Sequence, residues 1–96
     1  MSPETTRKFA LGQTVATPGA LCELFNRDVN VNALLTRHVT GDWGDLSEDD
    51  RAQNEAALLT GCRILSSYLV GEDRFKVWII TEADRSSTCI LLPSEY

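Results

Sequence analysis

The chain has 96 residues, of which 43% are hydrophobic and 24% are charged, and its formal net charge is −5. This length predicts one domain with a modest core, and no apolar run approaches the ~20 residues that a membrane span needs. Proteins that bind nucleic acid in general carry a basic face, because most of their affinity comes from neutralising phosphates. The acidic balance therefore argues against direct DNA binding and suits either solubility or docking on a basic partner.

The start of the chain, MSPETTRKF, has no apolar signal core, which predicts a cytoplasmic protein. Residues 1–8 are polar and predict a flexible N-terminus, followed by a single domain over residues 9–96. Residues 9–17 (FALGQTVAT) alternate partly between apolar and polar side chains. This stretch predicts a short strand or an extended arm on the core.

Two short helices are predicted next. Thr17 is a good N-cap, and Pro18 suits the first position of the helix that follows. The polar sequence NRD ends this helix. Asn30 then caps a second helix, which carries His38 near its end and stops at Gly41 in the left-handed conformation.

A third helix is predicted to begin after Ser47. Ser47 and Asp50 have the S-x-x-D form of a capping box, and Glu48 and Asp49 complement the helix dipole in the first turn. Gly61 is the expected C-cap.

The pattern then changes to that of strands, at residues 63–70, 74–81 and 87–93. Their connections are short, which predicts neighbouring antiparallel strands, with residues 9–16 as an optional fourth strand. In the middle strand one face carries Phe75, Val77, Ile79 and Thr81, and the other carries Lys76, Trp78, Ile80 and Glu82. Both faces have apolar side chains, so one is expected to meet the helices and the other to be partly covered or to lie at an interface. The fold class predicted is α+β, with about three short helices packed on one side of a small three- to four-stranded antiparallel sheet.

Three cysteines, Cys22, Cys62 and Cys89, lie far apart and form no C-x-x-C pair. This spacing predicts neither a structural zinc site nor another metal or cofactor, and instead buried, reduced thiols in a cytosolic protein.

His38 and Trp43 each allow two interpretations. His38 is the only histidine and the natural candidate for a general base, but it also suits a structural role at the end of a helix. Trp43, within GDWGD, either fills the seam between helices and sheet or anchors a partner.

The densest charge cluster of the chain is opposed only by Arg51 and consists of Asp42, Asp45, Glu48, Asp49, Asp50 and Glu55. Such a cluster can mimic the phosphates of DNA and occupy a DNA-binding groove of another protein. The alternative is helix capping together with a solvated face.

The hairpin at residues 81–88 carries a further candidate site. Glu82 and Arg85, with His38 as base, would suit metal-independent RNA cleavage, which needs a base, an acid and a cation. The alternative is a turn in which Asp84 and Ser86 bond their own backbone. The sequence contains no Gly-rich phosphate loop, G-x-S-x-G or H-E-x-x-H motif.

Three stretches together resemble a family of short bacterial proteins of unassigned function carried on plasmids and other mobile elements. They are TPGAL (17–21), RHVTGDWGDLSEDDRAQNEAAL (37–58) and the segment from RILSSY to LLPSEY (63–96). The specific runs are RHxxGDWG and WxITEADRSxTxxLLPxEY. Residues 22–33 depart from the pattern, as does Cys89, where a second threonine is expected.

The resemblance implies that the protein belongs to a mobile genetic element. Many compact acidic proteins of mobile elements inhibit host defence, as anti-CRISPR and anti-restriction proteins do, by blocking a basic groove. The leading hypothesis is therefore a non-enzymatic inhibitor of a nucleic-acid-handling defence complex, compatible with a homodimer. Its partner-binding surface would comprise Asp42, Trp43, Asp45, Glu48, Asp49, Asp50, Glu82 and Asp84.

A weaker similarity, in the order of helices before an antiparallel sheet, is to the small ribonuclease toxins with barnase-like and RelE-like folds. It implies a metal-independent ribonuclease that uses His38, Glu82 and Arg85. A plasmid accessory protein with neither activity is the third alternative.

Overall fold

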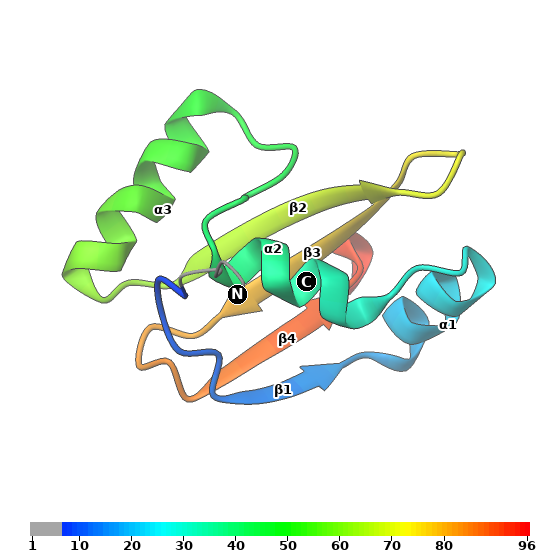
Figure 1. Ribbon diagram of the computed structural model, residues 1–96, viewed down its shortest axis with the longest axis horizontal. Helices are drawn as coiled ribbons and strands as arrows, with labels where there is room; N and C mark the ends of the chain where they lie inside the picture. Colours follow the sequence, from blue (N-terminus) through cyan, green and yellow to red (C-terminus); the bar gives the residue numbers. More distant parts are fainter. Residues whose placement is uncertain (1–6) are drawn as a thin grey trace, which may run out of the picture.

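The computed structural model describes residues 7–96 and contains three α-helices, a four-stranded sheet and a short 3₁₀ helix (Figure 1). In chain order the elements are β1 (Gln13–Ala16), α1 (Pro18–Asn26), α2 (Val31–Val39), α3 (Glu48–Thr60), β2 (Ile64–Val70), β3 (Phe75–Thr81), β4 (Ser87–Leu91) and the 3₁₀ helix η1 (Pro93–Glu95). The α+β class and the number of helices are as the sequence predicts. No helix in this described part of the chain is long and apolar enough to cross a membrane.

The sheet has the strand order β1-β4-β3-β2 and is mixed. β2 pairs with β3, and β3 with β4, in antiparallel fashion, as the short connections predict. β1 is the fourth strand, but it pairs with β4 in parallel, so the expectation of an entirely antiparallel sheet is wrong at this edge. The reason is that all three helices and two strands separate β1 from β4, and a connection of this length allows either direction.

Side-chain caps fix where the helices begin. An oxygen of Thr17, Asn30 and Ser47 in each case accepts a hydrogen bond from a backbone N–H in the first turn of the following helix. Gly61 ends α3 with a φ of 79°, in the left-handed conformation. These four positions are confirmed.

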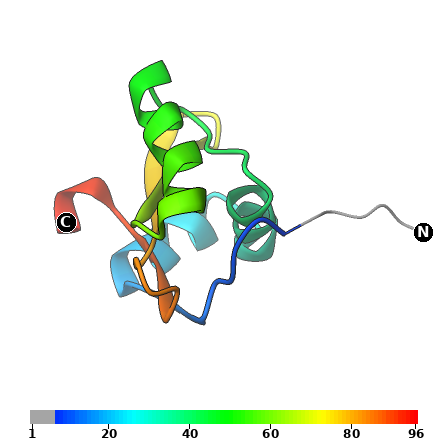
Figure 2. The same cartoon turned by 90° about the vertical axis from the view of Figure 1, so that its left-hand side faces the viewer.

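The main core lies between one face of the sheet and helices α1 and α2. It contains Ala20, Leu24, Leu34, Tyr68, Val70, Val77, Ile79 and Ile90. Of the two faces of β3, the one with Phe75, Val77 and Ile79 meets the helices, because Val77 and Ile79 are in this core and Phe75 packs against it. Figure 2 shows α2 on one side of the sheet and η1 on the other, where Tyr96 packs edge-on against Trp78 at 5.8 Å.

A smaller cluster joins α3 to the edge of the sheet at β2. It consists of Trp43, Ala57 and Ile64, with Phe9, Leu46 and Leu58 packed against it. Because α3 buries little else, this cluster and the polar contacts described below hold the helix in place.

The prediction of buried thiols is wrong for two of the three cysteines. Cys22 and Cys62 are exposed, and Cys89 is half-buried; all three are free. In α1 the buried side chains are Ala20 and Leu24, four residues apart, and Cys22 lies between them in sequence on the opposite face of the helix.

Candidate functional site

His38 belongs to a chain of hydrogen bonds inside the protein. Its Nδ1 lies 2.5 Å from Ser66 Oγ, and its Nε2 lies 2.9 Å from Thr81 Oγ1. Thr81 Oγ1 is in turn 2.7 Å from Thr88 Oγ1. Thr88 donates to the carbonyl oxygen of Leu11 at 2.7 Å. The chain therefore links α2, three strands and the N-terminal segment.

The carbonyl at the end of this chain determines the position of every proton in it. A hydroxyl has one proton, and Thr88 uses its own on Leu11, so Thr81 must donate to Thr88. His38 must then donate from Nε2–H to Thr81, and Ser66 must donate to Nδ1. His38 is thus the neutral Nε2–H tautomer, with both ring nitrogens satisfied.

The environment of His38 suits a structural role. The side chain is 0% exposed, and burial lowers its pKa to about 4. Its ring packs edge-on against Phe9 at 5.1 Å and against Trp43 at 6.1 Å. A general base must reach the proton that it removes, and this imidazole is sealed from substrate.

Arg85 and Glu82 do not complete a site around this histidine. Arg85 lies in the β3–β4 turn with a φ of 60°, and its guanidinium donates to the carbonyls of Cys62 at 2.7 Å and Ala57 at 3.1 Å. Glu82 is exposed. Within the described residues, these three side chains therefore do not surround a space that RNA could enter, and the geometry does not favour the ribonuclease alternative.

Trp43 fills the seam between α3 and β2, so the expectation that it anchors a partner is wrong and the packing alternative is confirmed. The side chain is 2% exposed, and its Nε1–H donates to Glu55 at 2.9 Å. The Trp43 carbonyl accepts from the backbone N–H of Ser67 at 3.0 Å, so the loop also runs beside the edge of β2.

Asp42 holds the loop before α3 and is partly neutralised there. It forms an ion pair with Arg37 at 2.7 Å, and the Arg37 guanidinium keeps the pKa of this carboxyl below its usual value. Its side chain also accepts from Gly44 N–H at 3.2 Å. Gly44 has a φ of 77°, and a Cβ there would collide with the carbonyl of Ser67. The GDWG sequence is thus explained by local geometry.

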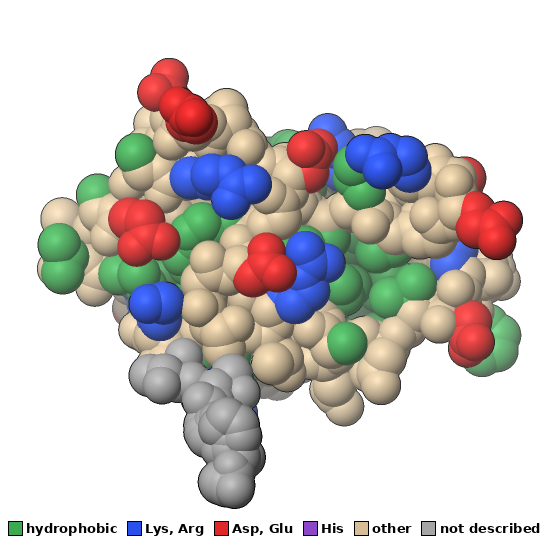
Figure 3. All heavy atoms as spheres, turned by 45° about the horizontal axis from the view of Figure 1, so that its top comes forward, with side chains coloured by type: hydrophobic (Ala, Val, Ile, Leu, Met, Phe, Trp, Pro, Cys, Tyr) green, Lys and Arg blue, Asp and Glu red, His purple; other side chains and the backbone are tan. Residues whose placement is uncertain are grey.

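The remaining acids of the cluster are exposed around the start of α3. Glu48, Asp49 and Asp50 form its first turn, and Asp45 precedes it. Among the described residues Arg51 forms no ion pair with them, and its guanidinium instead donates to two backbone carbonyls of the preceding loop. The space-filling view shows acidic side chains projecting from this outer end of α3 (Figure 3).

The acids of the hairpin lie at the other end of α3. Arg85 fixes this hairpin to α3 through the carbonyl of Ala57, close to the C-terminus of the helix (Figure 1). Asp84 accepts from Ser86 N–H at 3.0 Å, and hydrogen bonds to Ser86 lower the pKa of this carboxyl. The turn interpretation is confirmed for Asp84, and the candidate acids form two groups rather than one patch.

Asn54 has a structural role that is not among the predictions from the sequence. It is 4% exposed, donates to the Leu65 carbonyl at 2.6 Å and accepts from Leu65 N–H at 3.2 Å. Its amide thus takes the place of a neighbouring strand at the edge of β2. The available signal was an asparagine three residues before Ala57, on the face of α3 that meets the sheet.

Comparisons of the chain with protein families, with curated proteins and with solved structures give no significant match. The resemblance to plasmid-related proteins therefore stays a prediction from the sequence runs quoted above, and the function is argued from the geometry.

Proposed function

We propose that the protein is a non-enzymatic acidic binding protein that docks α3 on a basic surface of a partner protein. The observation that carries this proposal is the outer face of α3. Asp49, Ala52, Ala56 and Leu59 are all exposed and recur at helical spacing, so they share one face of the helix. Leu59, at the end of this face, is 90% exposed.

This face has the features of a helix that enters a groove of a partner. The two alanines allow close approach of another backbone, and Leu59 supplies an apolar side chain that gains from burial. The acids at the first turn attract lysine and arginine, which raises the association rate and excludes acidic partners.

α3 is also held rigidly without use of its outer face. Asn54 bonds Leu65, Glu55 accepts from Trp43, and Arg85 donates to the carbonyl of Ala57. A helix that is already ordered loses little conformational freedom on binding, which favours affinity.

The partner proposed is the nucleic-acid-binding surface of a host defence complex. The spaced carboxylates support this partner, because they can replace the phosphates that such a surface binds. The resemblance to proteins of mobile elements supports the setting, which is an anti-CRISPR-like inhibitor in the cytoplasm of a bacterial cell.

The test is a plasmid-interference assay in bacteria with an active CRISPR system of known type, repeated over several types. We expect the protein to restore transformation by a targeted plasmid in at least one of them. Asp49→Lys should reduce this protection and weaken binding to the purified effector by about tenfold or more, with a steep dependence on salt.

Glu72→Lys is the matched control, because it makes the same charge change at an exposed site outside α3. Circular dichroism and thermal unfolding distinguish lost binding from lost folding, since Asp49→Lys should cost at most about 1 kcal/mol through the helix dipole. Leu59→Glu should also abolish protection, although it adds a negative charge. Protection in none of the systems, or equal loss with Glu72→Lys, would refute the proposal.

A further inference from the structure

The two edges of the sheet differ in whether their outward backbone groups are hydrogen-bonded by other parts of the chain. At β2 the outward backbone groups of Leu65 are bonded by Asn54. Those of Ser67 are bonded by the preceding loop, where Asp45 N–H donates to the Ser67 carbonyl at 2.6 Å and Trp43 accepts from Ser67 N–H. The molecule therefore covers this edge itself at Leu65 and Ser67.

The edge at β1 has no such cover within residues 7–96. β1 is the last strand in the order and pairs only with β4. Gln13 and Thr17 donate their N–H groups toward β4, so by alternation Thr14 and Ala16 direct theirs, and their carbonyls, away from it. The strand QTVA contains none of the lysines, prolines or bulges that usually block an open edge.

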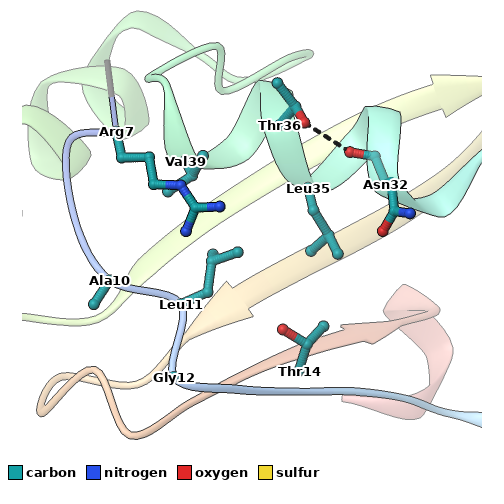
Figure 4. A pocket seen from close by; sticks show the side chains of 9 residues that line it. All are labelled: Arg7, Ala10, Leu11, Gly12, Thr14, Asn32, Leu35, Thr36 and Val39. Atoms are coloured by element: carbon teal, nitrogen blue, oxygen red, sulfur yellow. Dashed lines mark hydrogen bonds between the residues drawn. The ribbon is translucent and has the colours of Figure 1, made fainter. Parts of the chain in front are cut away.

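An open groove of about 540 Å³ lies between this strand and α2. Figure 4 shows that Arg7 and Leu11 extend into it from the N-terminal segment, Leu35 from α2 and Thr14 from β1. Among residues 7–96, Arg7 is the only charged residue that lines the groove. The groove thus combines a mixed lining, with the apolar side chains of Leu11, Leu35 and Val39 beside the polar ones of Thr14, Asn32 and Thr36, with one positive charge.

We propose that β1 binds an extended peptide segment of a partner protein, which adds a fifth strand to the sheet. The backbone of the segment would bond Thr14 and Ala16, which is the β-augmentation mode of recognition. Alternate side chains of a strand face the same side, about 7 Å apart. An aliphatic residue and an acidic residue two positions apart would therefore reach the lining at Leu35 and the guanidinium of Arg7 together.

The charge of Arg7 favours such a segment over a second copy of this chain. Pairing of β1 with β1 of another copy would bring only Gln13–Ala16 to the groove, and these residues carry no carboxylate. The site is also independent of the α3 surface, because β1 and β2 are opposite edges of the sheet.

The probe for this site is the acetylated and amidated octapeptide TTLTETTT, titrated into ¹⁵N-labelled protein up to millimolar concentration. We expect the amide resonances of Thr14 and Ala16 to shift, while those of Leu65 and Ser67 stay unchanged. Arg7→Glu should weaken binding by at least about threefold. Lys8→Glu is the matched control, since this neighbouring cation does not line the groove, and it should bind as the unchanged protein does.

The same peptide with lysine in place of glutamate should also bind more weakly. Absence of shifts at Thr14 and Ala16, or an equal effect of Lys8→Glu, would overturn the proposal. Sedimentation gives the other decisive outcome: a concentration-dependent dimer whose formation shifts these same two amides would mean that a second copy occupies the edge. Loss of α3 binding in the variants of the previous section has no bearing on this result.

Discussion

His38 is buried among hydroxyl groups. These groups explain why the fold tolerates a buried imidazole and why this imidazole is neutral. A buried polar group costs free energy unless it is hydrogen-bonded, and here Ser66 and Thr81 satisfy both ring nitrogens. Burial is the only cause of its lowered pKa, so no neighbouring charge offsets the penalty for protonation. Protonation of His38 is therefore much less favourable in this core than in the unfolded chain.

The stability of the fold should fall as the pH falls from about 6.5 to about 4. His38 titrates near 6.5 when unfolded and at about 4 when folded, so the unfolded chain binds an extra proton in this range. Above pH 6.5 the contribution is complete, and by pH 4.5 about 2.5 kcal/mol should be lost. Urea unfolding at pH 7.5 and 4.5 measures the difference.

The loss of unfolding free energy in this pH range can be assigned to His38, because the chain has a single histidine. His38→Leu should be less stable at pH 7.5, since Ser66 and Thr81 lose a partner, but should lack the decrease between the two pH values. The carboxyls of Asp42, Asp73, Asp84 and Glu95 also have lowered pKa values. Their contribution to stability is lost mainly as the pH falls below their unfolded values of about 4 to 4.5, so they account for only a small part of the decrease at pH 4.5. Equal unfolding free energies of the unchanged protein at both pH values would contradict the burial of a neutral imidazole.

At the scale of elements, α3 depends on side-chain hydrogen bonds more than on an apolar face. Its buried residues are only Asn54 and Ala57. Most helices of small domains are held by a broad apolar stripe. In α3 the amide of Asn54, which bonds both backbone groups of Leu65, takes over part of this role.

Asn54→Ala should destabilise the protein by about 1–3 kcal/mol, because it leaves the partly buried N–H and carbonyl of Leu65 unpaired. Asn54→Asp should cost at least as much, since a carboxylate can accept from Leu65 but cannot donate to its carbonyl. Urea unfolding measures both changes, with the exposed neighbour variant Gln53→Ala as control, expected within about 0.5 kcal/mol of the unchanged protein. A loss no larger than that of the control would show that the Asn54 bonds contribute little.

The elements that could be predicted from the sequence are those with local signals. Caps at Thr17, Asn30 and Ser47 and the glycine stop at Gly61 each involve residues within one helical turn, so the helix starts were correct. The sequence leaves the roles of His38 and Trp43 open, because the burial of these side chains depends on segments far away in the chain. The sequence predicts a fourth strand only as an option and over residues 9–16, whereas β1 covers Gln13–Ala16. Its direction cannot be deduced from the sequence, because its partner lies near the other end of the chain.

At the scale of the whole molecule, the sheet is asymmetric, with one edge covered by the chain and the other open. The acids predicted as one binding surface are likewise divided between the two ends of α3. Sequence order could not show this division, because hairpin and helix meet only through tertiary contacts such as that of Arg85 with Ala57. The distribution of surface charge is a property of the fold rather than of any segment.

The two edges should differ in amide hydrogen exchange. Thr14 and Ala16, whose N–H groups point outward from β1, should exchange at least about tenfold faster than Leu65 and Ser67, whose outward N–H groups are bonded at β2. Val15, which faces β4, serves as the internal control and should be protected. Exchange-NMR at neutral pH measures all five amides. Equal protection of Thr14 and Val15 would mean that the outer edge of β1 is already paired.

The parallel pairing of β1 with β4 also favours a particular order in which the strands of the sheet pair during folding. The two strands are joined by a loop that spans most of the chain, and closing such a loop costs more entropy than forming the adjacent hairpins. The β2–β3–β4 meander can therefore form first, with β4 as a temporary edge. During synthesis, β1 leaves the ribosome early and must wait for nearly the entire remaining chain before its partner exists.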